Sequence, residues 1–140
     1  MIDGCMRLPI LFALLLAAAM GAGEKSFLVQ ANRIAWAPIA PPGAPPGLMQ
    51  RLLHDNKDNQ LSSAIVKFPK GYVEPRHHHT RCGHSIYVLK GRIKAPGAIW
   101  TPGSFHYAAV MEPHGPLEAL EESEILFYTD GPFDYHVEKK

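Results

Sequence analysis

Proline and glycine interrupt this sequence so often that long helices are excluded as its main structural element. The 140 residues contain 13 prolines and 12 glycines, and proline breaks a helix interior because it lacks the backbone N–H donor. Between them lie short apolar or alternating stretches, which are typical of β-strands bounded by turns. The strand candidates are residues 27–36, 48–53, 61–68, 84–90, 92–95, 98–100, 104–111 and 124–129. Their number and spacing predict an all-β sandwich or barrel.

Length, net charge and the absence of certain motifs exclude several classes of protein. A chain of 140 residues fits one domain and not two. The net charge is only +1, and the 14 basic and 13 acidic residues form no basic stripe, so nucleic acid is not an expected partner. The sequence has no G-x-S-x-G motif, which leaves serine hydrolysis without support.

The N-terminus has the layout of a secretory signal peptide. The uncharged run LPILFALLLAAAM covers residues 8–20, follows Arg7 and is followed by the small residues GAG. It is too short to span a bilayer comfortably. We therefore expect a signal peptide over residues 1–23, cleavage, no stable membrane span afterwards, and a periplasmic or secreted protein. The alternatives are an uncleaved anchor and a buried core helix.

The remaining chain is expected to comprise an arm and a barrel. Residues 24–59 are predicted to form an N-terminal arm with edge strands, because the segment 37–47 holds five prolines and two glycines. Residues 60–140 are predicted to form the barrel. Cleavage removes Cys5 and leaves Cys82 alone, so no internal disulfide is possible. Cys82 is then a soft metal ligand, a redox-sensitive thiol or simply a small buried residue.

Histidines supply the candidate chemistry. His77 and His79 project from the same face of an extended strand, whereas His78 points to the opposite face. His84 begins the next apolar strand, where a buried imidazole needs a partner such as a metal. His114 follows about thirty residues later. The alternative is a surface run of histidines that binds metal adventitiously.

The first histidine segment resembles a motif of the cupin superfamily. It reads Gly71-x5-His77-x-His79-x4-His84-x6-Gly91, whereas the family pattern is G-x5-H-x-H-x3,4-E-x6-G. The spacing matches, but His84 stands where the family usually has a ligand glutamate. The resemblance implies a small double-stranded β-helix, a jelly-roll barrel with a metal at its mouth.

A second segment extends the resemblance. Gly103-x5-Ala109-x-Met111-x2-His114 is similar to the second cupin motif, G-x5-P-x-G-x2-H, with Ala109 and Met111 in place of proline and glycine. Together the motifs cover about residues 60–130. The surroundings of Trp36 and Trp100 further resemble small single-domain cupins of the anti-sigma-factor type, a group that includes acetylacetone- and dihydroxyacetophenone-cleaving dioxygenases.

The resemblance implies a site for one divalent transition metal ion, with Fe, Mn, Ni, Cu and Zn all open. Its ligand positions fall on four residues: His77, His79, His84 and His114. Neutral imidazoles leave the ion its full charge, so we expect anionic or enolisable ligands to bind well. Octahedral iron or manganese keeps open positions, whereas tetrahedral zinc is closed. His106 is an available substitute ligand.

Three functions remain open on this basis. The first is an exported metal-dependent dioxygenase acting on a small oxygenated organic compound. The second is a non-catalytic metal- or small-molecule-binding module, and the third is a sugar-acid isomerase or lyase. Family members often dimerise, so a homodimer is a further expectation. We expect Glu74 and Arg76 to lie in a solvated loop; the alternative is that they gate the site. Tyr87 is expected to lie outside the barrel, and these apolar side chains to fill it: Phe68, Ile86, Val88, Trp100, Phe105 and Phe127.

Overall fold

The computed structural model describes residues 24–139, so the expected signal peptide lies outside the described residues. A single 3-10 turn, η1 (Ala31–Arg33), precedes the strands. The strands are β1 (Ala37–Ile39), β2 (Leu48–Asp55), β3 (Ser62–Phe68), β4 (Val73–Glu74), β5 (His77–His78), β6 (His84–Lys90), β7 (Ile93–Ala95), β8 (Ala98–Trp100), β9 (Phe105–Ala108), β10 (Leu117–Ala119), β11 (Ser123–Thr129) and β12 (His136–Val137). Within this range no helix is long and apolar enough to cross a membrane.

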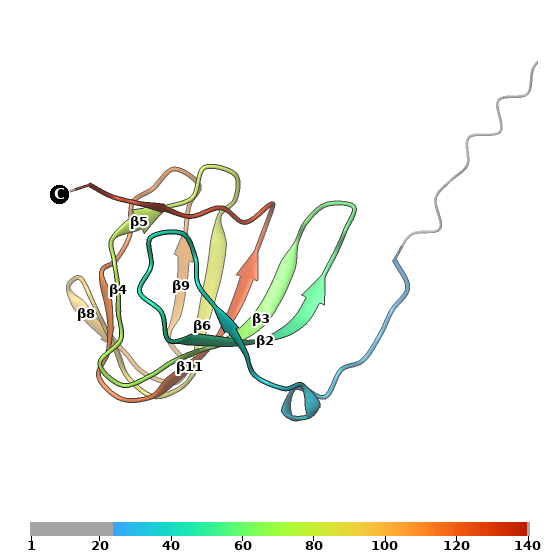
Figure 1. The fold of residues 1–140 in the computed structure, drawn as a ribbon, viewed down its shortest axis with the longest axis horizontal. Helices are drawn as coiled ribbons and strands as arrows, with labels where there is room; N and C mark the ends of the chain where they lie inside the picture. Colours follow the sequence, from blue (N-terminus) through green and yellow to red (C-terminus); the bar gives the residue numbers. More distant parts are fainter. Residues whose placement is uncertain (1–23, 140) are drawn as a thin grey trace, which may run out of the picture.

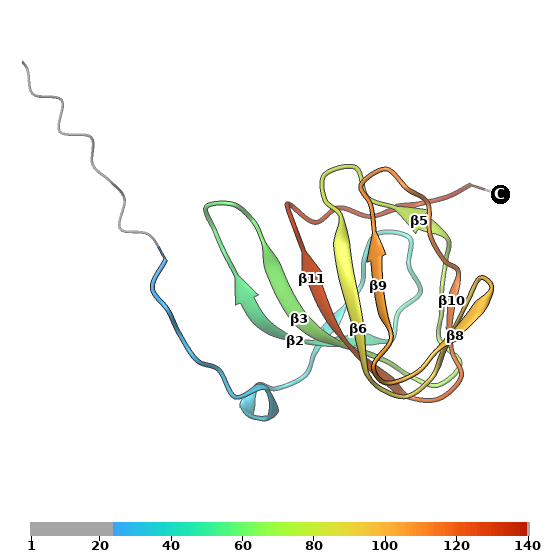
Figure 2. The same ribbon diagram turned by 180° about the vertical axis from the view of Figure 1, so that it is seen from behind.

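The strands form an antiparallel jelly-roll barrel, which confirms the predicted fold class (Figures 1 and 2). One sheet has six strands in the order β1-β2-β3-β11-β6-β9, and the other has four in the order β4-β10-β7-β8. A two-stranded ribbon of β12 and β5 lies at one end of the barrel. Because β11 lies between β3 and β6 and the connections between strands are short, residues far apart in sequence meet at the barrel mouth.

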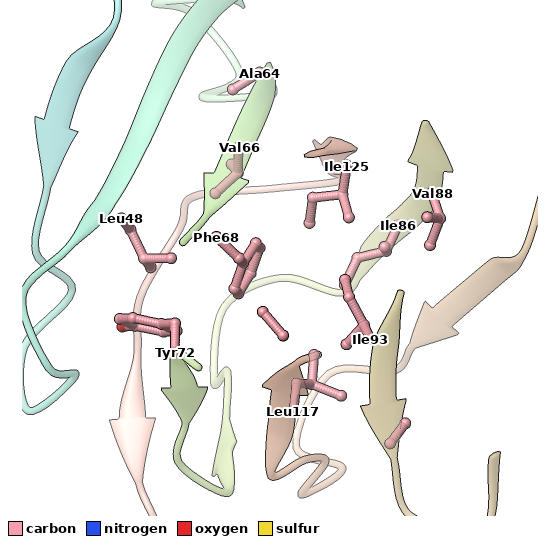
Figure 3. Packing of buried hydrophobic residues seen from close by; sticks show 12 residues of the cluster. Leu48, Ala64, Val66, Phe68, Tyr72, Ile86, Val88, Ile93, Leu117 and Ile125 are labelled. Atoms are coloured by element: carbon pink, nitrogen blue, oxygen red, sulfur yellow. The ribbon is translucent and has the colours of Figure 1, made fainter. Parts of the chain in front are cut away.

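The core follows from strand alternation. Side chains from both sheets, including Phe68, Ile86, Ile93 and Leu117, converge between the layers (Figure 3). Val88 is fully buried, while Trp100 and Phe127 pack against the cluster and are partly buried. The prediction for Phe105 is wrong, since it is 65% exposed. In β9 it points outward, because His106, one residue on, takes the inward face.

The outer face of the six-stranded sheet carries the side chains that alternate with this core. Tyr87 is 44% exposed there, as expected from its place in β6. Trp36 covers part of the same sheet, with the Arg51 guanidinium and the Lys67 ammonium each lying over its ring. The N-terminal segment therefore packs on the sheet through cation–π contacts.

Gly91 closes the tight turn between β6 and β7 and offers a stability test. It has φ +85°, and an added Cβ would lie 2.5 Å from the Glu122 carbonyl oxygen. Gly97 has φ +73° but open space around it. We expect Gly97→Ala to cost about 1–2 kcal/mol of unfolding free energy for the left-handed backbone alone. Gly91→Ala should cost more, about 3 kcal/mol or greater, because backbone atoms must also shift. Denaturant unfolding of both variants measures the difference, and equal losses would contradict the role of the close contact.

Candidate metal centre

A backbone bridge brings the two histidine motifs together. The His77 N–H donates to the His114 carbonyl at 3.0 Å, and the His114 N–H donates back to His77 at 2.9 Å. Next to this bridge, the backbone N–H of Met111 donates to the His79 carbonyl at 2.7 Å. Histidines separated by more than thirty residues therefore lie side by side at the barrel mouth. His77, His79 and His114 each place one ring nitrogen within 4.8 Å of the others.

These three imidazoles are oriented by backbone carbonyls. The Nδ1–H of His77 donates to the Pro75 carbonyl at 2.8 Å, and that of His114 donates to the Glu112 carbonyl at 2.9 Å. His79 donates in the same way to the carbonyl of Asp134. Each bond fixes the tautomer and leaves Nε2 with a free lone pair. The Nε2 atoms of His79 and His114 are buried and have no partner among the described residues. Such orphaned acceptors fit a metal ion.

His84 lies beside this set but is held differently. It is 2% exposed, and its ring centroid lies 4.7 Å from that of His79 and 4.8 Å from that of His114. Its Nδ1 is buried without a partner in the described chain, so no carbonyl fixes its tautomer. The structure therefore gathers all four predicted ligands, of which three form the compact, oriented set. The coordination of a metal by His84 stays a prediction.

Burial keeps these histidines neutral. Removal from water lowers the pKa of His77 to about 3 and that of His84 to about 2, and the neighbouring imidazoles add to both shifts. Burial also lowers the pKa of His79 and His114. Neutral imidazole is the form that binds metal, so the lone pairs are available throughout the physiological pH range.

His78 points to the opposite side of the strand, as alternation predicts. Its Nδ1 pairs with the Glu138 carboxylate, and its ring stacks on His136 at 5.3 Å. Both partners belong to the C-terminal segment, which pairs with β5 through β12. In Figure 1 this segment runs along the end of the barrel beside β5. It forms a clasp over the strand that carries His77.

Asp134 anchors this C-terminal clasp. The sequence alone indicated no role for this segment beyond a polar-aromatic tail. The Asp134 carboxylate accepts from the backbone N–H groups of Thr80 and Arg81, from the Thr80 hydroxyl, and from His136. Burial alone would raise the pKa of Asp134, but these hydrogen bonds lower it overall. The same residue supplies the carbonyl that orients His79. Alternation of aromatic and polar residues over 133–136 was the available signal.

Cys82 is a buried small residue, 2% exposed, near His79 and Asp134. These three residues place potential ligand atoms within 4.8 Å of one another. However, burial raises the pKa of the Cys82 thiol, which keeps it protonated, and the His79 nitrogen on this side already donates to Asp134. The Cys82 side chain therefore packs behind His79 and does not act as a metal ligand.

His106 faces inward from β9 but lies outside the compact set. Its ring stacks on Trp100 at 4.8 Å and lies 6.4 Å from His114. Both histidines line a cavity of about 270 Å³ on one side of the cluster. Arg76 also lines this cavity and donates to the Gly115 carbonyl at 3.3 Å.

A larger cavity of about 370 Å³ lies against His77, His79 and His84. Its walls are mostly apolar, and Pro41 and Ile39 of the proline-rich segment form part of them. The remaining lining side chains include Leu48, Val66, Ile86, Ile125, Phe127 and Phe133. This volume is typical of small-molecule sites.

The polar residues Gln50, Ser62, Glu74 and Tyr135 also line this cavity and were not among the predicted site residues. Glu74 lines it from β4, so the expectation of a solvated loop is wrong. The two-residue strand β4 pairs with β10, which turns the Glu74 side chain to the barrel interior. Tyr135 also lines the cavity, and its ring stacks on His77 at 4.1 Å. The Tyr135 hydroxyl is buried and has no partner among the described residues.

A jelly-roll barrel with motif histidines at its mouth defines a cupin. The profile of the ChrR cupin-like domain family matches residues 24–134, which is most of the chain. The protein therefore belongs to this family.

Solved structures share the fold at low sequence identity. A candidate acetylacetone dioxygenase from Methylibium petroleiphilum PM1 superposes with a TM-score of 0.69 at 20% identity, covering 83% of both chains. The acetylacetone dioxygenase of Acinetobacter johnsonii gives 0.60 at 17% identity, over 91% of this chain and 79% of that one. The polyketide cyclase RemF of Streptomyces resistomycificus gives 0.67 at 18% identity, over 83% and 87%. At these identities the likeness concerns the fold.

A curated relative matches over part of its length. The DNA damage-repair/toleration protein DRT102 of Arabidopsis thaliana is 31% identical over 87 residues, which cover 56% of this chain. The match spans only 26% of that protein, so the two share a domain-sized segment.

Replacement of single histidines tests the centre. We expect His79→Ala or His114→Ala to remove bound metal, because each deletes a carbonyl-oriented donor of the compact set. His78→Ala is the matched control and should retain full stoichiometry, since His78 faces the C-terminal segment. His84→Ala should keep some metal on the other three. Elemental analysis of protein purified without an affinity tag measures this. Equal metal loss from His78→Ala would refute the geometry.

Acid should destabilise the metal-free protein. The buried histidines have a lowered pKa when folded and an ordinary value of 6.5 when unfolded. The unfolded chain therefore binds more protons below pH 6.5, and stability falls as pH drops toward about 3. The slope is at most about 1.4 kcal/mol per pH unit for each histidine. The melting temperature of the metal-free protein should fall across this window, and a flat profile would contradict the buried neutral cluster.

Proposed function

We propose that the protein is an exported metal-dependent dioxygenase that acts on a small oxygenated organic compound. One observation carries the proposal: of the three imidazoles oriented by backbone carbonyls, His77 and His79 line an apolar cavity of about 370 Å³. A site that only stores metal needs no apolar cavity beside it. The fold likeness to acetylacetone dioxygenases adds support.

Protein residues have defined parts in this function. His77, His79 and His114 would hold the ion, with His84 as the predicted fourth ligand. A bound divalent transition metal supplies Lewis-acid polarisation of a substrate oxygen and redox chemistry with dioxygen. The apolar walls, with Ile125 and Phe127 among them, exclude water and favour an organic molecule over hydrated ions.

Export rests on the N-terminal sequence. The uncharged run at residues 8–20 and the small residues after it support cleavage near residue 23. The absence of a second cysteine after cleavage agrees with a protein stabilised by its core and a metal rather than by a disulfide.

Oxygen consumption tests the dioxygenase proposal directly. We expect iron-loaded protein to consume dioxygen with at least one member of a panel of diketones and phenolic ketones. His79→Ala should abolish uptake, whereas His78→Ala, which keeps the metal, should retain it. An oxygen electrode and product mass spectrometry measure the reaction and the two added oxygen atoms. Absence of uptake with every compound, in protein shown to contain iron, would favour the non-catalytic binding module.

A further inference from the structure

Four polar side chains line the larger cavity besides the histidines: Gln50, Ser62, Glu74 and Tyr135. Glu74 enters from β4 and Tyr135 from the C-terminal segment, so neither belongs to the two histidine motifs. The remaining lining is mostly apolar. Two polar side chains in such surroundings are costly unless a ligand or water satisfies them.

The Tyr135 hydroxyl is the clearest sign of a missing partner. The residue is 6% exposed, and its oxygen has no hydrogen-bond partner among the described residues. Stacking on His77 at 4.1 Å, with 24° between the ring planes, holds the ring in place. A buried phenol normally finds an acceptor, so this oxygen is available to a molecule in the cavity.

Glu74 lies close enough to Tyr135 for its charge to raise the pKa of the phenol, an effect second to burial. It has the same secondary effect on Tyr72. The Tyr72 hydroxyl, however, already donates to the Pro45 carbonyl at 2.8 Å. No salt bridge among the described residues involves Glu74. Glu74 and Tyr135 thus both line the cavity, and the Tyr135 hydroxyl has no hydrogen-bond partner among the described residues.

We infer that Glu74 and Tyr135 form a hydrogen-bonding pair that donates to a neutral oxygen of the ligand, away from the oxygen that the histidine centre binds. The ligand is therefore a neutral organic molecule with two oxygen functions joined by an apolar body. This inference rests on the proposed function for the role of the histidines. It makes the pair a determinant of specificity and not a metal ligand, because Glu74 is absent from the compact donor set.

The protonation of Glu74 supports donation. Burial raises the pKa of the Glu74 carboxyl from 4.5 to about 8, so the protonated acid dominates near neutral pH. A divalent ion at the histidines acts in the opposite direction, because nearby positive charge favours the carboxylate. The decisive experiment therefore uses metal-loaded protein and a substitution that separates a neutral donor from a charged acceptor.

Binding to the manganese-loaded protein in the absence of dioxygen is the test, because octahedral manganese keeps positions open for a ligand oxygen and no oxidation proceeds without dioxygen. The probes are acetophenone and its 3-acetyl and 4-acetyl derivatives, which add a second carbonyl acceptor at two positions. We expect wild-type protein to bind at least one diacetyl probe about tenfold more tightly than acetophenone, the effect of roughly one good hydrogen bond. Calorimetric titration measures the preference without any catalysis.

Three variants then assign the preference. Glu74→Met and Tyr135→Phe should each reduce it to about twofold or less, while Glu74→Gln should preserve it, since an amide also donates. Tyr72→Phe is the matched control, because it removes a buried hydroxyl that bonds to the backbone, and it should leave the preference unchanged. Manganese stoichiometry near one in every variant verifies that the centre is intact.

Several results would overturn the inference. Equal affinity of wild-type protein for all three probes would show that no second acceptor is recognised. Loss of preference in Glu74→Gln as large as in Glu74→Met would show that a charged carboxylate is required. Loss of manganese in Glu74→Gln would make Glu74 a ligand. None of these depends on oxygen uptake, so failure of the dioxygenase proposal and failure of this inference are distinguishable.

Discussion

The reciprocal backbone hydrogen bonds between His77 and His114 are the contact on which the site depends. They join the two histidine motifs across the barrel mouth, and each partner is itself a member of the compact donor set. Because the bonds involve the main chain, the spacing of the imidazoles is set by the strand register and not by side-chain flexibility. Carbonyls of Pro75, Glu112 and Asp134 then fix the rotation of each ring. The result is a centre arranged before any ion arrives, which reduces the entropic cost of binding.

Burial acts in opposite senses on the two kinds of titratable group in the cavity. It lowers the pKa of His77 and His84 and raises that of Glu74. Both shifts favour the uncharged form, as expected where water is excluded. In the metal-free protein the imidazoles therefore present lone pairs and the carboxyl presents a proton. In the same apolar surroundings, the neutral histidines are therefore hydrogen-bond acceptors or metal ligands, and the neutral Glu74 carboxyl is a hydrogen-bond donor.

Sequence reasoning reached the parts of the site that depend on local periodicity. The two-residue alternation places His77 and His79 together and sends His78 outward, where it meets Glu138 and His136. The position of Glu74 and Tyr135 in the cavity was not predictable from the sequence, because their orientation depends on β4 and on the C-terminal clasp. β4 is only two residues long and takes its register from β10. No pattern is readable over two residues. Phe105 shows the converse error, since its hydrophobicity suggested the core but its neighbour His106 takes the inward face.

The histidine at position 84 and the acid at position 74 have a joint consequence for the ligand. A glutamate at position 84 would neutralise part of the charge of a divalent ion, whereas His84 leaves it whole. Glu74 is not a member of the compact donor set, so it does not take the place of a ligand carboxylate. A ligand oxygen with partial negative charge, such as a carbonyl oxygen, is therefore favoured next to the histidines, because the imidazoles add no negative charge to the ion. In the inferred binding mode Glu74 and Tyr135 donate to the second ligand oxygen, so a neutral carbonyl or hydroxyl is favoured there. The two ends of one cavity thus select different oxygens, and a molecule must carry both to be held in a single orientation.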